Sequence, residues 1–255
     1  MDRWTLLIAL LLALIAAVQG AGYVRKGIRS RWTVVWMTLS MLAQFVALGI
    51  RGEMRGACPL VDSGEMAVFV AWSLSLCYLA IGSVYRLSLL GVFTAPLVSF
   101  LLVLAFIPGW LETSVEKSAH IDAWREAHAA FSVLAYGALA LSAVAAVMFL
   151  VLNKQLKAAS LSTGLFKNLP PARELSAVVK RLMLLGFVTL TLGVVCGGIM
   201  ETPDGLGRHF IAAMVLWGAY AVLLGVSKVR GMPTRRLAIS AIVLFLFSLL
   251  IFPLL

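Results

Sequence analysis

Long apolar runs alternate with short polar segments along the whole chain. Eight runs are long enough to cross about 30 Å of hydrocarbon as a helix; they cover residues 4–23, 32–50, 66–84, 88–108, 128–152, 181–200, 209–227 and 237–254. A helix satisfies its own backbone hydrogen bonds, which the interior of a bilayer requires. The pattern therefore predicts an all-α integral membrane protein of about eight transmembrane helices, with residues 1–255 forming a single polytopic membrane domain.

Composition agrees with this class and narrows the choice of partners. Of the 255 residues, 62% are hydrophobic and 13% are charged, and the mean hydropathy is +1.01. A water-soluble core cannot bury so much apolar surface, so the bilayer is the expected solvent and membrane lipid the expected neighbour. The net charge of +10 comes from short basic clusters between apolar runs. That placement is typical of membrane orientation and argues against nucleic acid as a partner.

The charged residues also predict which way the chain is inserted. Asp2 and Arg3 precede the first run and cancel, whereas Arg25, Lys26 and two further arginines follow it. The positive-inside rule then places both termini on the outer (periplasmic) side of the cell inner (plasma) membrane, with the first run kept as an anchor. Under this topology the inner side holds fifteen basic residues and one acid, a charge of +14. The outer side holds six basic residues and ten acids, a charge of −4.

All three histidines fall on the predicted outer side. His120 and His128 come just before and at the start of the fifth run, and His209 opens the seventh. Nearby on this side are two arginines and two tryptophans: Arg125, Arg208, Trp110 and Trp124. Imidazole ligates heme iron and guanidinium pairs with carboxylates such as heme propionates. These residues suit a heme seat with tryptophan walls, and histidines that merely lie at the membrane interface are the alternative interpretation of the same pattern. His120 is then a third ligand, a replacement for His209, or a solvated loop histidine.

Several segments of the second half, taken in order, resemble a known family. They are His128 to Tyr136 (HAAFSVLAY), Leu169 to Leu175 (LPPAREL), Arg181 to Phe187 (RLMLLGF), Leu190 to Gly193 (LTLG) and Trp217 to Tyr220 (WGAY). Over about 120–250 the chain resembles the cytochrome c assembly family, the CcsA- and CcmC-like heme-handling membrane proteins. The resemblance is to its short eight-helix branch of HemX- and YpjD-like proteins.

This resemblance implies a cofactor, its ligands and a partner. In the family the histidine that opens the helix after the outer loop is an axial heme ligand, and His128 stands at that place. A second ligand comes from a later outer segment, where His209 is available. The resemblance thus implies heme b held at the outer face by His128 and His209, a function in cytochrome c biogenesis, and a cytochrome c synthesis protein as partner.

The chain departs from the family pattern at one segment. Heme-mounting members carry a tryptophan-rich outer motif ending in Trp-Asp-Pro-Lys or Trp-Asp-Pro-Glu, whereas residues 201–209 read ETPDGLGRH. The departure keeps an alternative open. In it the chain is a HemX-like membrane regulator or scaffold of tetrapyrrole synthesis, acting through its basic cytoplasmic loops without heme transfer.

Other chemistry has weaker support. The three histidines with Glu126 suit zinc by ligand type, but without a recognised spacing. A disulfide between Cys58 and Cys196 stays open, although no Cys-x-x-Cys motif favours it. No nucleophile with a base, catalytic carboxylate pair or phosphate-binding glycine loop stands in the sequence, so we do not expect an enzyme.

Two segments predict packing and surface features. Gly193 and Gly197 form a Gly-x-x-x-Gly pair, which lets another helix of the same chain approach closely. The inner loop 153–180 carries five basic residues around Pro170 and Pro171. Its apolar residues Phe166, Leu169, Leu175, Val178 and Val179 predict a short interfacial helix on anionic lipid.

Overall fold

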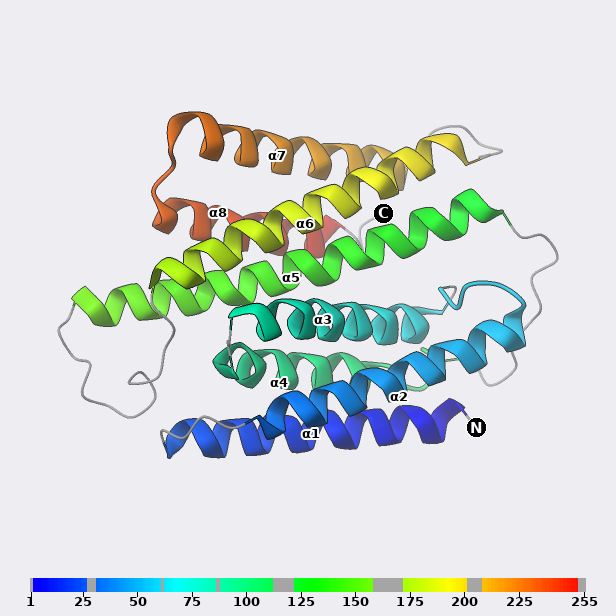
Figure 1. Cartoon of the computed structure of the whole chain (residues 1–255). Helices are drawn as coiled ribbons and strands as arrows, with labels where there is room; N and C mark the ends of the chain where they lie inside the picture. The colour runs from blue at the N-terminus through cyan, green and yellow to red at the C-terminus, as the bar shows by residue number, and fades with distance from the viewer. Residues whose placement is uncertain are drawn as a thin grey trace. The chain divides into compact units, whose positions relative to one another are not determined.

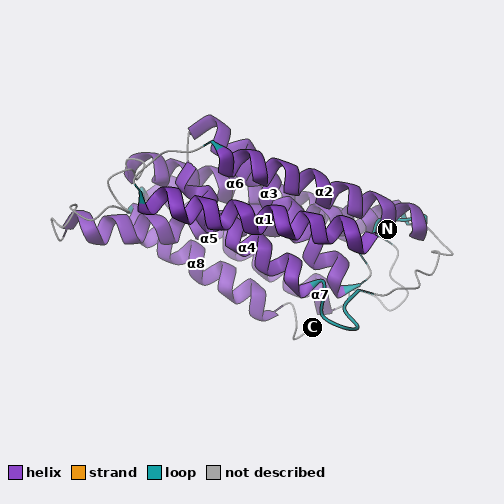
Figure 2. Cartoon of the chain, turned by 90° about the horizontal axis from the view of Figure 1, so that it is seen from below, coloured by secondary structure: helices purple, strands orange, loops and turns teal. Residues whose placement is uncertain are grey.

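The computed structural model of the chain consists of helices and connecting loops (Figure 1). It describes residues 2–26, 31–60, 62–85, 88–111, 122–157, 172–200 and 208–251, and all regular structure within these ranges is helical (Figure 2). The described part holds eight helices: α1 (Asp2–Arg25), α2 (Trp32–Arg55), α3 (Ser63–Tyr85), α4 (Ser88–Leu104), α5 (Ala123–Lys157), α6 (Ala172–Ile199), α7 (Arg208–Arg230) and α8 (Thr234–Ile251).

The helices confirm the predicted all-α membrane fold. Among the described residues, α1, α2, α3, α5, α6 and α7 are long and apolar enough to cross a membrane by length and composition. The shortest two are α4, with 17 residues, and α8, with 18. The side on which each terminus lies stays a prediction.

The helices group into two compact units. The first, here the N-terminal unit, contains α1 to α4, and the second, the C-terminal unit, contains α5 to α8. The prediction that residues 1–255 act as a single polytopic domain is not tested by this grouping.

The N-terminal unit packs through small residues and a buried polar face. On α1 the residues Leu6, Ala9, Ala13 and Ala16 are almost fully buried, at the three- and four-residue spacing of one helix face. Ser40 of α2 donates a hydrogen bond to the Ala9 carbonyl at 2.7 Å, so the two helices lie close together. The chain leaves α2 at Gly56, whose φ of 67° is the left-handed conformation that glycine adopts freely.

The C-terminal unit is built on the pair α5 and α6, which lie side by side (Figure 1). The buried face of α5 is rich in alanine, including Ala135, Ala138 and Ala145. A Cβ added at Gly186 of α6 would lie 2.7 Å from the Leu139 side chain of α5. The Leu139 side chain therefore packs directly on α6 at Gly186, where the missing side chain leaves room for it.

Helix α8 is joined to this pair near each of its ends. Ser176 of α6 and Thr234 of α8 form a hydroxyl hydrogen bond of 3.0 Å. Near the other end, the Tyr136 hydroxyl of α5 donates to the Ser248 carbonyl at 3.4 Å. Both bonds join residues far apart in sequence, one between two side chains and one from a side chain to the backbone, and they attach α8 to α6 and α5.

The predicted interfacial helix in loop 153–180 is wrong in its second half. Helix α6 already begins at Ala172, and Leu175, Val178 and Val179 are all 0% exposed. Protein therefore covers them where lipid contact was expected, and Ser142 of α5 donates a hydrogen bond to the Val179 carbonyl at 3.1 Å. Phe166 and Leu169 lie outside the described residues.

Candidate functional site

His128 lies near the start of α5, and its side chain contacts α6. Its Nδ1 is 2.7 Å from the Gly193 carbonyl oxygen. A carbonyl only accepts hydrogen bonds, so Nδ1 carries the proton and donates it. Neutral imidazole has one proton for two nitrogens, which leaves Nε2 with an unshared electron pair. A neutral imidazole with one unprotonated nitrogen is the form in which histidine binds a metal. The His128 ring is half-buried.

The His128 ring rests on a helix position that has no side chain. A Cβ added at Gly197 would lie 2.6 Å from His128 Nδ1 and 2.9 Å from its Cε1. One turn earlier, a Cβ at Gly193 would lie 3.0 Å from Ser132 Oγ. The predicted Gly-x-x-x-Gly packing within the chain is thus confirmed, and its partner is the His128 end of α5.

The start of α5 places Trp124 and Arg125 near this ring along the helix. Asp122 caps the helix, since its Oδ1 accepts a hydrogen bond from the Trp124 amide at 3.0 Å. Trp124 stands one turn before His128 on the same helix face, and it is 49% exposed. Arg125 is exposed as well. Trp124, Arg125 and His128 therefore lie within two turns at the start of α5.

The start of α7 lies beside the end of α6 that contacts His128. A Cβ at Gly198 would lie 3.7 Å from the Phe210 ring, which is ordinary contact. Farther along, Trp217 donates to Thr191 Oγ1 at 2.9 Å and stacks on Phe187 at 5.8 Å between ring centroids. These contacts join three of the segments that carried the family resemblance.

Arg208 and His209 are the first two residues of α7, so their backbone lies in the C-terminal unit near the end of α6. Their side chains are outside the described part of the structure, and so is all of His120. Trp110 belongs to the N-terminal unit, where its carbonyl accepts the Gly64 amide at 2.7 Å, and it is 38% exposed. The roles predicted for these residues in the heme site stay predictions.

Alternative metal and thiol chemistry gains no support from the described residues. Within them no three residues among histidine, cysteine, aspartate and glutamate group as metal ligands. The zinc hypothesis depends on His120 and on the His209 side chain, which lie outside the described residues. Cys58, Cys77 and Cys196 are present as thiols.

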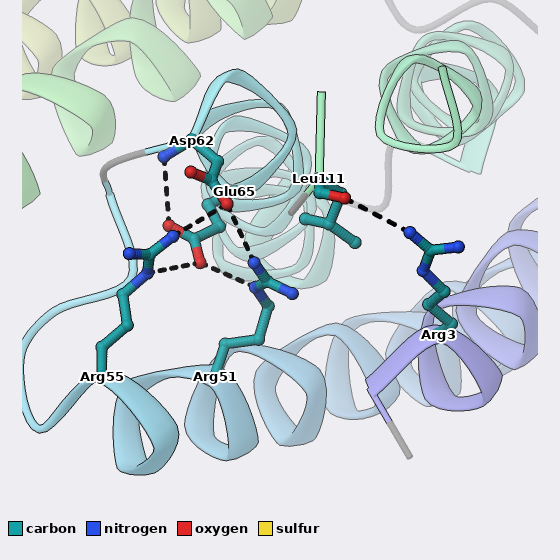
Figure 3. Close-up of polar contacts among 6 residues, drawn as sticks. All are labelled: Arg3, Arg51, Arg55, Asp62, Glu65 and Leu111. Atoms are coloured by element: carbon teal, nitrogen blue, oxygen red, sulfur yellow. Dashed lines mark hydrogen bonds and ion pairs between the residues drawn. The ribbon is translucent and has the colours of Figure 1, made fainter. Parts of the chain in front are cut away.

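A second polar cluster, which the sequence analysis did not single out, lies in the N-terminal unit (Figure 3). Arg51 Nε and Arg55 Nε donate to Glu65 Oε1 at 2.7 and 2.8 Å. The terminal nitrogens of the same arginines lie 2.9 and 2.8 Å from Asp62 Oδ2. We call these four residues the charge quartet. Their side chains are 8% exposed or less, and their formal charges cancel.

Local sequence explains how the charge quartet forms. Arg51 and Arg55 are one turn apart on α2, so both side chains leave the same face. Glu65 Oε2 also accepts the Asp62 amide at 3.2 Å, which is the reciprocal half of a capping box at the start of α3. The four-residue spacing of the arginines and the Asp-x-x-Glu pattern were visible in the sequence. They could have indicated that these arginines and acids interact.

Comparison with known proteins gives consistent matches. The model of the family described as cytochrome C assembly protein matches residues 60–254. A cytochrome c biogenesis protein CcsA of Chlamydomonas reinhardtii is 26% identical over 226 residues, covering 83% of this chain and 62% of that protein. CcsA of Prochlorococcus marinus strain MIT 9215 is 27% identical over 244 residues, covering 83% of this chain and 78% of that protein. Protein HemX of Brevibacillus brevis is 30% identical over 182 residues, covering 70% of this chain and 63% of that protein.

The family match covers every element of the C-terminal unit, including the His128 end of α5 and the glycines of α6. It begins just before α3 and so also includes half of the charge quartet. Together with the apolar helices, it shows that this chain is a multi-pass membrane protein that belongs to the cytochrome c assembly protein family.

Proposed function

We propose that the chain holds heme at the outer face of the inner membrane and hands it on during cytochrome c biogenesis, as a carrier and not an enzyme. The observation that carries the proposal is His128, whose Nδ1 proton is bound by the Gly193 carbonyl and whose Nε2 is therefore an open ligand atom. The membership in a cytochrome c assembly family supports the choice of heme as the ligand.

The donor set around His128 fits heme in its chemistry. Imidazole nitrogen is an axial ligand of heme iron, and His209 is the proposed second ligand. Arg125 is exposed three residues before His128, where its guanidinium can pair with a propionate; Arg208 is proposed for the other propionate. Trp124 is proposed as a wall of the site, whereas the predicted roles of Trp110 and His120 stay predictions. When bound, heme supplies an iron centre that later becomes part of a cytochrome.

The chain's own residues prepare this site before any ligand arrives. The Gly193 carbonyl holds the imidazole proton on Nδ1, which increases the electron density on Nε2 and fixes the plane of the ring. Asp122 caps α5, so the helix turn that carries Trp124, Arg125 and His128 is formed without the ligand. A pre-formed site loses less conformational entropy on binding.

The test is an absorption spectrum of detergent-purified protein after addition of hemin, in oxidised and reduced forms. We expect a bis-histidine Soret and α-band pattern in wild type, lost in His128→Ala and in His209→Ala. His120→Ala is the matched control and should keep the pattern. A spectrum that is unchanged by His128→Ala would contradict the proposal.

A second candidate function is regulation of tetrapyrrole synthesis by protein binding. It is favoured by the likeness to protein HemX and by an exposed basic end of the C-terminal unit, formed by Lys154, Arg173, Lys180, Lys228, Arg230, Arg235 and Arg236. Such a protein binds its partner through these residues and needs no histidine. Wild-type protein that takes up no heme, but captures a tetrapyrrole-synthesis enzyme unless Arg235 and Arg236 are replaced by glutamine, would favour this candidate.

A further inference from the structure

We propose that Gly197 of α6 is a positioning residue for His128. By leaving room for the imidazole ring, it lets the Gly193 carbonyl select the tautomer that keeps Nε2 open. The inference rests on the proposed function for its biological purpose. Its physical content concerns the protein without heme and can be tested there.

The contact distances show how closely the ring fills the space over Gly197. A Cβ at this position would lie 2.6 Å from Nδ1, 2.9 Å from Cε1 and 3.4 Å from Cγ of His128. Ordinary contacts between such atoms are about 3.5–4.0 Å. The Nδ1 side of the ring therefore lies directly against α6 at this position, and the smallest side chain at 197 would have to displace the ring.

The same position of the ring brings Nδ1 to the Gly193 oxygen, one helical turn away. Their distance of 2.7 Å is a short, well-formed hydrogen bond. A carbonyl oxygen has two lone pairs, so the Gly193 oxygen can accept this proton besides its helical bond. Moving the ring off Gly197 lengthens this bond and removes the reason for the proton to stay on Nδ1.

The expected damage from a methyl group at 197 is local. The three nearest atoms that it would meet belong to the His128 ring, and a side chain can rotate where a backbone cannot. Gly193 differs, because a Cβ there would also lie 3.3 Å from the Ser132 backbone nitrogen. Gly197→Ala is thus the variant that displaces the ring while leaving the α5 and α6 backbones in place.

The experiment measures the imidazole tautomer by nitrogen NMR of heme-free protein labelled with ¹⁵N-histidine. Spectra are recorded at about pH 8.5, where an ordinary imidazole is neutral. His128→Gln identifies the His128 signals by their loss. Gly218→Ala is the matched control, since a Cβ at that helical glycine meets nothing within 4 Å.

We expect wild type and Gly218→Ala to show His128 protonated on Nδ1. Gly197→Ala should move most of the proton to Nε2, the form that free histidine favours in water. Heme affinity, measured by hemin titration, should fall at least tenfold in Gly197→Ala and stay within twofold of wild type in Gly218→Ala. Wild type protonated on Nε2, or Gly197→Ala with the wild-type tautomer, would overturn the inference.

The NMR result separates this inference from the proposed function. An Nδ1 proton that is lost in Gly197→Ala supports positioning even when wild type binds no heme, in which case only the heme proposal fails. If Gly197→Ala does not fold, the wild-type tautomer still decides, because an Nε2 proton there excludes the selection by Gly193.

Discussion

The two units hold the ionisable groups between their helices in opposite ways. In the N-terminal unit, each guanidinium of the charge quartet contacts both carboxylates, and the side chains are at most 8% exposed. In the C-terminal unit, the His128 imidazole has one hydrogen-bond partner among the described residues, the Gly193 carbonyl, and its second nitrogen carries no proton in the neutral form. The difference teaches that buried charge alone does not indicate a binding site. A site needs a group that its own protein leaves incomplete.

The largest expected effect comes from a substitution in the charge quartet of the N-terminal unit. Arg51→Met should lower the free energy of unfolding by about 3–5 kcal/mol, because it leaves buried carboxylate charge without its partner. The measurement is unfolding in mixed micelles with increasing denaturing detergent. Arg125→Met, which removes an exposed arginine, is the control and should cost less than about 1 kcal/mol. Equal effects of the two substitutions would show that the charge quartet adds nothing to stability.

An intermediate effect tests whether the C-terminal unit is held by close packing in place of charge. Gly186→Ala should destabilise by about 1–3 kcal/mol, because the new Cβ meets the Leu139 side chain. Adding Leu139→Ala should make the pair less harmful than the sum of the two single substitutions, by about 1 kcal/mol. The same unfolding measurement applies, and additive effects would contradict a direct clash.

The smallest expected effect concerns the hydrogen bond that joins α7 to α6. Thr191→Val removes the acceptor of the Trp217 indole proton and should cost about 1 kcal/mol, the usual size of a hydrogen bond between membrane helices. Thr189→Val is the matched control, since the Thr189 hydroxyl bonds only to carbonyls of its own helix. A cost that is the same for both threonines would mean that the indole bond contributes nothing.

Much of the fold could be predicted from the sequence, because a membrane-spanning helix is encoded by a continuous apolar run. The start of α2 at residue 32 was placed correctly, but its end was placed at 50, whereas the helix continues to Arg55. Hydropathy stops at the first arginine, and it cannot report that Asp62 and Glu65 neutralise Arg51 and Arg55. The charge quartet was missed for that reason.

The candidate site shows the same limit in another form. His128 and the Gly193–Gly197 pair were each singled out from the sequence, as a ligand and as a packing motif. Their contact joins residues 65 positions apart, and a one-dimensional pattern holds no information on which glycine faces which side chain. The tautomer of His128 depends on that contact, so only the structure indicates it.

The length of α5 bears on how far His128 lies from the hydrocarbon layer of a membrane. Its 35 residues span about 52 Å, whereas the hydrocarbon layer is about 30 Å thick. Lys154 is exposed near one end, and His128 lies 26 residues earlier on the same helix, about 39 Å away. If α5 stands upright with Lys154 at one border of the hydrocarbon, His128 would lie about 9 Å beyond the other border. In that placement its unprotonated nitrogen would be at the depth of the lipid headgroups, where both water and membrane can reach it.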